Sequence, residues 1–144
     1  CDVLNADGGT RCASICAGMV ALRLAVRHII EAGRSRPIGR RSDNDTEPLS
    51  QEEKLIHLNS VLPDDIAAVS VGLLENAVWT DLDYELDAGA DVDLNVIRTA
   101  SGKYIEVQGT GEEGSFSRDE LNKLLDSADN ALNQIHEIIQ NITS

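Results

Sequence analysis

Four short strand-like segments, separated by turn signals, occupy residues 66–109 and limit the fold of this chain more than any other feature. Each segment is rich in β-branched and aliphatic residues, as expected for strands. The segments are IAAVSVGLL (66–74), VWTDLDY (78–84), VDLNVIRT (92–99) and KYIEVQG (103–109). Connections as short as these join antiparallel neighbours. The pattern therefore predicts a four-stranded antiparallel meander, in which each strand pairs with the next one along the chain.

Two longer segments with helical periodicity flank these strands. In the first, RCASICAGMVALRLAVRHIIEAG (11–33), apolar residues recur at spacings of four and three, which is the period of one helical face. The expected buried stripe is Ile15, Met19, Leu22, Val26 and Ile29. Thr10 is expected to be the N-cap, because its hydroxyl can accept hydrogen bonds from free amides. Gly33 is expected to end the helix.

The C-terminal helix has a clearer start. Ser117 and Glu120 have the spacing of a capping box, and Phe116 can pack against Leu121. The apolar stripe of this helix comprises Leu121, Leu124, Leu125, Ala128, Leu132, Ile135 and Ile139. Two helices that each bury one stripe against a sheet predict an α+β fold, with a four-stranded antiparallel sheet and two long helices on one face of it.

Residues 34–64 form a long polar connection between the first helix and the first strand. They hold all three prolines and charges of both signs, and a short helix is expected around residues 52–58. A connection of this length inside a compact domain is usually functional or mobile. The length of 144 residues fits one domain. The start CDVLNADGG, without an initiator methionine, is typical of an interior piece of a longer protein.

Composition narrows the cellular setting. Three cysteines, an odd number without a framework spacing, favour reduced thiols and the cytosol. No apolar run is expected to be long enough to span a bilayer. The net charge of −13 is uneven, because residues 1–41 carry seven Arg against three acids. A basic N-terminal part suits an anionic partner, although a solvated charged face is the commoner explanation.

The stretch DLDYELDAGADVD (81–93) contains six acids and neither Lys nor Arg. Carboxylates this close repel one another, so a chain selected for stability alone would intersperse cations. A bend between adjacent strands would bring Asp87 and Asp93 together, with Asp83 nearby. Two such carboxylates can hold Mg²⁺ through oxygen ligands, or share a proton for general acid catalysis. The alternative is a solvated acidic turn, but the acids extend beyond what a turn requires.

The stretch ADGGTR, which includes Gly9, Thr10 and Arg11, precedes the first helix. Free amides and the positive end of the helix dipole gather there, and the Arg11 guanidinium adds a two-pronged donor. This combination is well matched to phosphate, while an ordinary tight turn with a capped helix is the simpler alternative. An anion site and a carboxylate cluster in one small domain together indicate phosphoryl transfer.

Four ordered blocks of this sequence resemble bacterial ribonuclease PH, the phosphate-dependent 3′-exoribonuclease that trims tRNA precursors. The blocks are DVLNADGGTRCASI, AAVSVGLL, TDLDYELDAGADVDLNV and GKYIEVQGTGEEGSFSRDEL. The resemblance covers most of residues 2–33 and 65–140. It implies the ribonuclease PH fold, which is similar to domain 2 of ribosomal protein S5, and phosphorolysis, in which inorganic phosphate attacks the 3′-terminal phosphodiester and releases a nucleoside diphosphate. It also implies RNA as the partner, a hexameric ring and a cytoplasmic location, without membrane association.

The resemblance assigns roles to five residues. Phosphate-binding residues of the family carry over to Gly9, Thr10 and Arg11. The paired catalytic aspartates of the family, with Mg²⁺ between them, carry over to Asp87 and Asp93.

The chain also departs from the family pattern. Family members begin with another sheet-and-helix half, so residues 1–144 are expected to be the C-terminal part of the enzyme. The other half carries a further phosphate-contacting arginine and much of the RNA path. Cys12 replaces a usual Thr, and Leu86 replaces a usual acid. A second class of function therefore stays open, a non-catalytic RNA-binding or structural ring subunit of exosome type.

Overall fold

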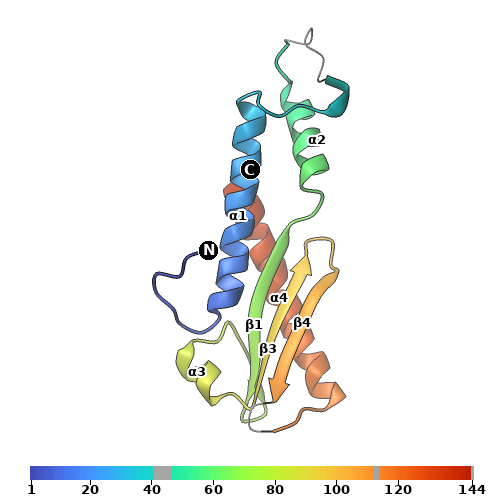
Figure 1. The fold of residues 1–144 in the computed structure, drawn as a ribbon. Coiled ribbons are helices and arrows are strands. Elements are labelled where there is room, and N and C mark those ends of the chain that lie inside the picture. Colours follow the sequence, from blue (N-terminus) through green and yellow to red (C-terminus); the bar gives the residue numbers. More distant parts are fainter. Residues whose placement is uncertain (41–46, 112–113, 144) are drawn as a thin grey trace.

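The computed structural model describes residues 1–40, 47–111 and 114–143 and shows an α+β fold built on a four-stranded sheet (Figure 1). The strands are β1 (Ile66–Leu74), β2 (Ala77–Thr80), β3 (Val92–Thr99) and β4 (Tyr104–Gly111). All neighbouring pairs are antiparallel. The prediction of a four-stranded antiparallel sheet is confirmed, and β1 and β3 have the predicted bounds.

The strand order in the sheet is β2-β1-β3-β4, so the predicted meander is wrong. β1 and β2 form the expected hairpin, but β3 pairs with β1, with Val96 opposite Val69, and not with β2. Every residue of β1 between its two ends is buried, and a strand that is apolar on both faces suits a central position. β2 is short, because the chain leaves the sheet at Asp81, which has a φ of 59°, and then forms helix α3 (Tyr84–Gly89).

Helix α4 (Arg118–Thr143) covers one face of the sheet. Its predicted capping box is confirmed, since the Ser117 amide donates to Glu120 Oε2 at 2.7 Å and the Glu120 amide donates to Ser117 Oγ at 3.2 Å. All seven predicted stripe residues lie in or against the main core, and four of them are buried: Leu124, Ala128, Leu132 and Ile139. The sheet face that α4 covers includes Val69 and Val71.

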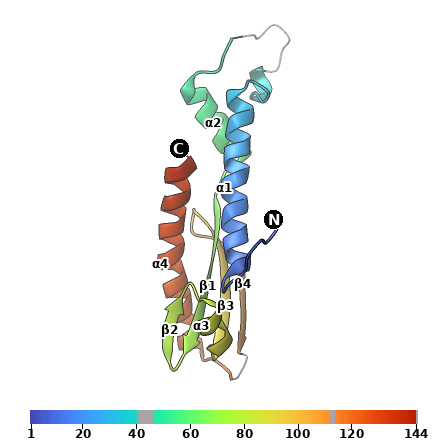
Figure 2. The same cartoon turned by 90° about the vertical axis from the view of Figure 1, so that its left-hand side faces the viewer.

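Helix α1 (Thr10–Glu31) begins on the opposite face, but further along Cys16 and Val20 pack against the core that α4 covers. The prediction that both long helices share one face therefore fails for the first turn of α1 and holds for its middle. Successive residues of a strand point to opposite faces, and Ala68 and Ile97 therefore point away from α4. Cys12 of α1 packs against both of them. Figure 2 shows β1 lying between α4 and α1. Because β1 offers apolar side chains on both faces, each face requires its own cover.

The predicted stripe of α1 is confirmed in part, since Met19 is buried and Ile15 and Val26 pack against buried clusters. Leu22 and Ile29 are 49% and 41% exposed, whereas the buried residues of this helix are Cys12, Met19 and Ile30. Apolar and small residues occur around most of α1, so their spacing does not select one face. The contacts with β1 and with neighbouring helices make that selection.

Within the described part of the chain, α1 is long and apolar enough to cross a membrane by length and composition. This differs from the expectation that no apolar run has the required length. A buried core helix and a signal sequence meet the same criteria. Of the tested window of α1, 11% is buried, and the helix packs against β1 through Cys12 and Cys16.

The polar connection of residues 34–64 contains regular structure. Its elements are the 3₁₀ helix η1 (Ile38–Arg40) and helix α2 (Gln51–Val61), while residues 41–46 lie outside the described part. The expected short helix is therefore confirmed and is longer than predicted. The Glu53 amide donates to Ser50 Oγ, and the Ser50 amide donates to Glu53 Oε2, which completes a capping box. Leu58 of α2 packs with Ile30 of α1, so the connection is attached to the C-terminal end of α1.

We expect the free energy of unfolding to decrease as the pH falls below about 6.5, and His136 to cause part of this decrease. Burial lowers the pKa of His136 from its ordinary value of 6.5, the positive charge of Arg98 lowers it further, and Asp65 and Asp64 oppose these effects. A histidine with a lower pKa in the folded state takes up its proton more readily when unfolded. Its contribution to stability is therefore full above pH 6.5 and is lost as the pH falls towards the folded pKa.

Urea denaturation across this pH range measures the effect. The His136→Phe variant should show a shallower dependence of unfolding free energy on pH than the unsubstituted protein. His28 is exposed, so the His28→Gln variant should retain the full dependence. An unaltered pH dependence in His136→Phe would contradict the prediction.

Candidate functional site

The loop before α1 leaves the start of this helix without a side-chain cap among the described residues. The N-cap is Gly9, with a φ of 68°, and not Thr10 as predicted. Glycine suits this position, because φ is positive and Ser70 Oγ lies 3.1 Å from where a Cβ would be. Thr10 is the first helical residue, and its hydroxyl donates to the carbonyl oxygen of Asp7 at 2.5 Å. Uncapped amides at a helix N-terminus provide donors for an anion.

The same loop is tied to the start of α3 by Asp7. Its Oδ1 accepts hydrogen bonds from the amides of Gly8, at 2.9 Å, and Tyr84, at 2.7 Å. A Cβ on Gly8 would lie 2.1 Å from the carbonyl oxygen of Leu82, so only glycine allows this close contact between the two backbones. The loop that begins α1 and the segment that carries the acidic run are therefore held side by side.

The structure separates the roles of the acids in this run. Asp83 caps α3, since its Oδ1 accepts from the Leu86 amide at 2.9 Å. This local role agrees with the simpler interpretation of an acid at a turn. Asp87, predicted in a bend between strands, lies within α3 and is partly buried. It therefore lies on a short helix whose start is capped by Asp83.

Asp93 lies on β3 and is connected to α1 through Asn95. Cys12 Sγ donates to Asn95 Oδ1 at 3.0 Å, and Asn95 Nδ2 donates to Asp93 Oδ2 at 3.3 Å. Because residues 93 and 95 have the same parity, both side chains leave the sheet on the face where α1 begins. Asp93 therefore has a direct structural link to the start of α1.

The Cys12 thiol reports the charges that surround this link. The pKa of Cys12 is raised to about 11, chiefly by burial and next by the neighbouring Cys16. The positive charge of Arg11 lowers the pKa, while Asp93 and Asp81 raise it. One cation and two carboxylates therefore lie within electrostatic reach of a single side chain in the first turn of α1.

Arg11 extends from α1 across β4. Its Nη2 lies 2.9 Å from Glu106 Oε1, and its Nη1 is 3.5 Å from Gln108 Oε1. The Arg11 side chain is 48% exposed, and an ion pair this accessible contributes about 0–1 kcal/mol. The guanidinium can therefore exchange the Glu106 carboxylate for a phosphate at small cost.

The five predicted site residues come from three elements. Hydrogen bonds link Asp93 of β3 to the start of α1, whereas the Asp87 side chain makes no hydrogen bond or ion pair among the described residues. Gly9, Thr10 and Arg11 start α1, Asp87 lies on α3, and Asp93 lies on β3. Sequence reasoning missed three residues that organise them: Asp7, Asn95 and Glu106. The period of two along β3 could have identified Asn95, because it shares a face with Asp93. The partners of Asp7 and Glu106 are distant in sequence, so no local signal identifies them.

The donor set is compatible with Mg²⁺. The described residues contain no group of three or more His, Cys, Asp or Glu arranged for a metal ion. Magnesium usually binds through one or two carboxylates and completes its shell with water and substrate phosphates. Asp87 on α3 and Asp93 on β3 carry carboxylates of this kind, and they stay the predicted ligands.

Comparison with known proteins finds one matching family and many relatives. Residues 64–131 match the family described as "3′ exoribonuclease family, domain 2". The chain is 46% identical over 125 residues to ribonuclease PH of Rhodopirellula baltica, and this alignment covers 87% of this chain and 44% of that relative. It is 40% identical over 136 residues to ribonuclease PH of Bacillus subtilis, and this alignment covers 94% of this chain and 46% of that relative. The chain spans about half the length of these relatives.

Proposed function

Because this chain belongs to the ribonuclease PH family, we propose that it supplies the C-terminal part of a phosphate-dependent 3′-to-5′ exoribonuclease. The proposed substrate is RNA, with tRNA precursors trimmed at their 3′ ends, and the proposed products are nucleoside diphosphates. The observation that carries this proposal is the hydrogen-bond chain from Cys12 through Asn95 to Asp93. It joins an uncapped helix N-terminus to a carboxylate, so the groups for the attacking phosphate and for the leaving oxygen are neighbours.

The start of α1 is proposed to bind the attacking phosphate. The amides at Gly9 and Thr10 and the positive end of the helix dipole provide donors and a favourable field. Arg11 adds a charge-assisted pair once its guanidinium leaves Glu106. The contacts of Asp7 with the Gly8 and Tyr84 amides hold the loop in position before phosphate arrives.

Asp93 is proposed to be the general acid. A phosphate oxygen attacks the terminal phosphorus, the bond from phosphorus to the 3′ oxygen breaks, and protonated Asp93 delivers its proton to that oxygen. Asn95 orients the Asp93 carboxyl group through its amide. Asp87 would hold Mg²⁺, with Asp93 as a second ligand only in its ionised form, and the ion would supply positive charge against the charge that develops on the transferred phosphoryl group.

The chain is proposed to act within a larger assembly, a hexameric ring in the cytoplasm. It spans about half the length of its relatives, and it exposes several large apolar side chains. On α1 and α4 these are Leu22, Leu24, Ile29, Ile138 and Ile142. Exposed apolar groups that gather on a surface commonly mark interfaces. We propose that the remainder of the protein and neighbouring subunits cover these apolar side chains.

Phosphate dependence of the reaction products tests the proposed function. The complete enzyme, incubated with RNA that has a single-stranded 3′ end, should release nucleoside diphosphates only when inorganic phosphate and Mg²⁺ are present. Sulfate, which can occupy an anion site but cannot form the product, is the control. Release of nucleoside monophosphates without phosphate would show hydrolysis and contradict the proposal. Binding of RNA without any product would favour the non-catalytic ring subunit.

A further inference from the structure

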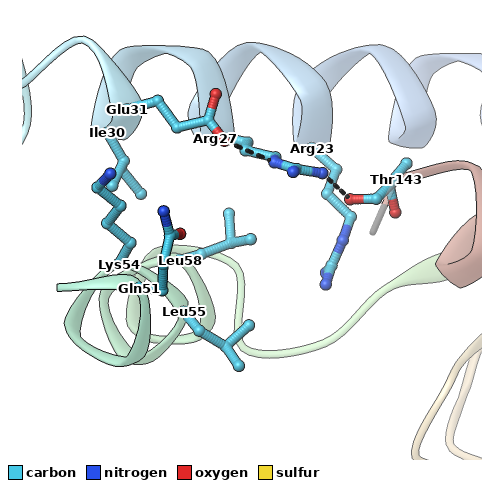
Figure 3. A pocket seen from close by; sticks show the side chains of 9 residues that line it. All are labelled: Arg23, Arg27, Ile30, Glu31, Gln51, Lys54, Leu55, Leu58 and Thr143. Atoms are coloured by element: carbon cyan, nitrogen blue, oxygen red, sulfur yellow. Dashed lines mark hydrogen bonds and ion pairs between the residues drawn. The ribbon is translucent and has the colours of Figure 1, made fainter.

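A cavity of ≈ 440 Å³ lies between α1, α2 and the last residues of α4, far from the site described above (Figure 3). Its α1 residues begin at Arg23, so the cavity lies about 20 Å along the helix axis from Thr10. Protein interiors are close-packed and leave few voids larger than a water molecule. Cavities of a few hundred Å³ with an apolar lining and a few polar groups are typical of small-molecule sites.

Cations outnumber acids in the lining of this cavity. Arg23 and Arg27 come from one face of α1, where like charges four residues apart repel, and Lys54 extends from α2 towards α1 (Figure 3). Glu31 is the acid of the lining, and it pairs with Arg27 at 2.9 Å. In a chain with a net charge of −13, such a concentration of positive charge favours an anionic ligand.

Two donors in the lining lack partners among the described residues. Lys54 makes no ion pair there, and Arg23 Nε is buried without a hydrogen bond. Arg23 is otherwise held in place, because its Nη1 lies 2.9 Å from Asp65 Oδ1. Buried donors are almost always satisfied in folded proteins. Arg23 Nε has almost no accessible surface, so a ligand cannot reach it, whereas an anionic group between α1 and α2 would neutralise Lys54.

The remainder of the lining is apolar. Ile30 and Leu58 are 2% and 6% exposed and face the cavity from α1 and α2, while Leu55 is 55% exposed at its edge. These side chains cannot satisfy a hydrated inorganic ion, but they can cover an apolar group.

We propose that this cavity binds a small organic anion, with its phosphate or carboxylate group at Lys54 and its apolar body against Ile30 and Leu58. The volume of the cavity suits a ligand up to the size of a mononucleotide. A ligand with a phosphate and a ligand with a carboxylate offer the same feature to the site, an oxyanion attached to an apolar body.

Binding of four probes to the purified protein tests this site. Adenosine monophosphate and octanoate each have an anionic head group and an apolar body. Inorganic phosphate has only the anionic group, and adenosine has only the body. Backbone amide shifts in NMR spectra should show saturable binding of one or both amphipathic probes at Ile30 and Leu58. Binding of the nucleotide alone would assign a phosphate head group, and binding of octanoate alone would assign a carboxylate.

Two variants and one control define the contacts. Lys54→Gln should weaken binding about tenfold or more, because it removes one charge-assisted interaction. Leu55→Trp should fill the edge of the cavity and abolish saturable binding. Lys123 is exposed on α4, so Lys123→Gln should leave the affinity unchanged. All of these variants alter residues outside the main core, so their spectra should otherwise match that of the unsubstituted protein.

The proposal is overturned if neither amphipathic probe binds at millimolar concentration. It is also overturned if Lys54→Gln and Leu55→Trp bind the probes as tightly as the unsubstituted protein does. Shifts confined to Gly9, Thr10 and Arg11 would also overturn it, because they would place the nucleotide at the start of α1. This test does not depend on the proposed ribonuclease function. If the complete enzyme shows no phosphorolysis, the proposal for the cavity is unaffected. If the cavity binds none of the probes, the proposal of phosphorolysis is unaffected.

Discussion

Replacing Asp93 by Asn is expected to slow release of nucleoside diphosphates by the complete enzyme by about 10²–10⁴-fold, the usual loss when a general acid is removed. The substitution is nearly isosteric. The amide oxygen of the new side chain can still accept the hydrogen bond that Asn95 now donates to Asp93 Oδ2. The fold and the position of the side chain should therefore be preserved, while the transferable proton is lost. A single-turnover assay with saturating phosphate measures the effect on the chemical step.

Asp91 provides a matched control for this substitution. It lies two residues before Asp93 and is exposed, and its backbone amide donates to the carbonyl oxygen of Leu73 at 2.8 Å. Asp91→Asn removes one negative charge from the same acidic run and should leave the rate nearly unchanged. Near-normal phosphorolysis by Asp93→Asn would refute its role as general acid. An equal loss in both variants would indicate a general effect of charge and would refute the role as well.

Replacing Arg11 by Ala is expected to raise the phosphate concentration needed for half-maximal rate by about 10–100-fold. A hydrogen bond to a charged group typically contributes about 1.5–3 kcal/mol, and each 1.4 kcal/mol corresponds to a factor of ten. The rate at saturating phosphate should fall less, because Asp87 and Asp93 remain. Initial rates across a range of phosphate concentrations separate these two effects.

Substitution of Glu106 provides a second test of the role of Arg11 in phosphate binding. Its carboxylate pairs with Arg11 and competes with phosphate for the guanidinium. Glu106→Gln should therefore lower the phosphate requirement in the protein that keeps Arg11, and should have no such effect in the Arg11→Ala background. Arg34, an exposed arginine beyond the end of α1, provides the control Arg34→Ala. An unchanged phosphate dependence in Arg11→Ala would remove this residue from the phosphate site.

The candidate site was predictable where its residues form contiguous motifs. Gly9, Thr10 and Arg11 adjoin the start of a helix, and the chemistry of a helix N-terminus follows from local backbone geometry. The acidic run was visible for the same reason, but its members could not be assigned separate roles. Asp83 caps α3 and Asp87 lies within it, which depends on where β2 stops. Asp7 and Glu106 became visible only with their distant partners, Tyr84 and Arg11.

The sequence by itself determined the elements whose signals are local. The bounds of β1 and β3 and the capping box at Ser117 all follow from patterns within a few residues. Only the tertiary structure decided the strand order β2-β1-β3-β4 and the course of α1, which begins on the face opposite α4 and then joins the core that α4 covers. Both features depend on which apolar surfaces cover β1, a strand that is buried on both of its faces. Hydrophobic burial is not directional, so the pattern along the chain specifies that a face must be covered, and packing of the whole chain selects the element that covers it.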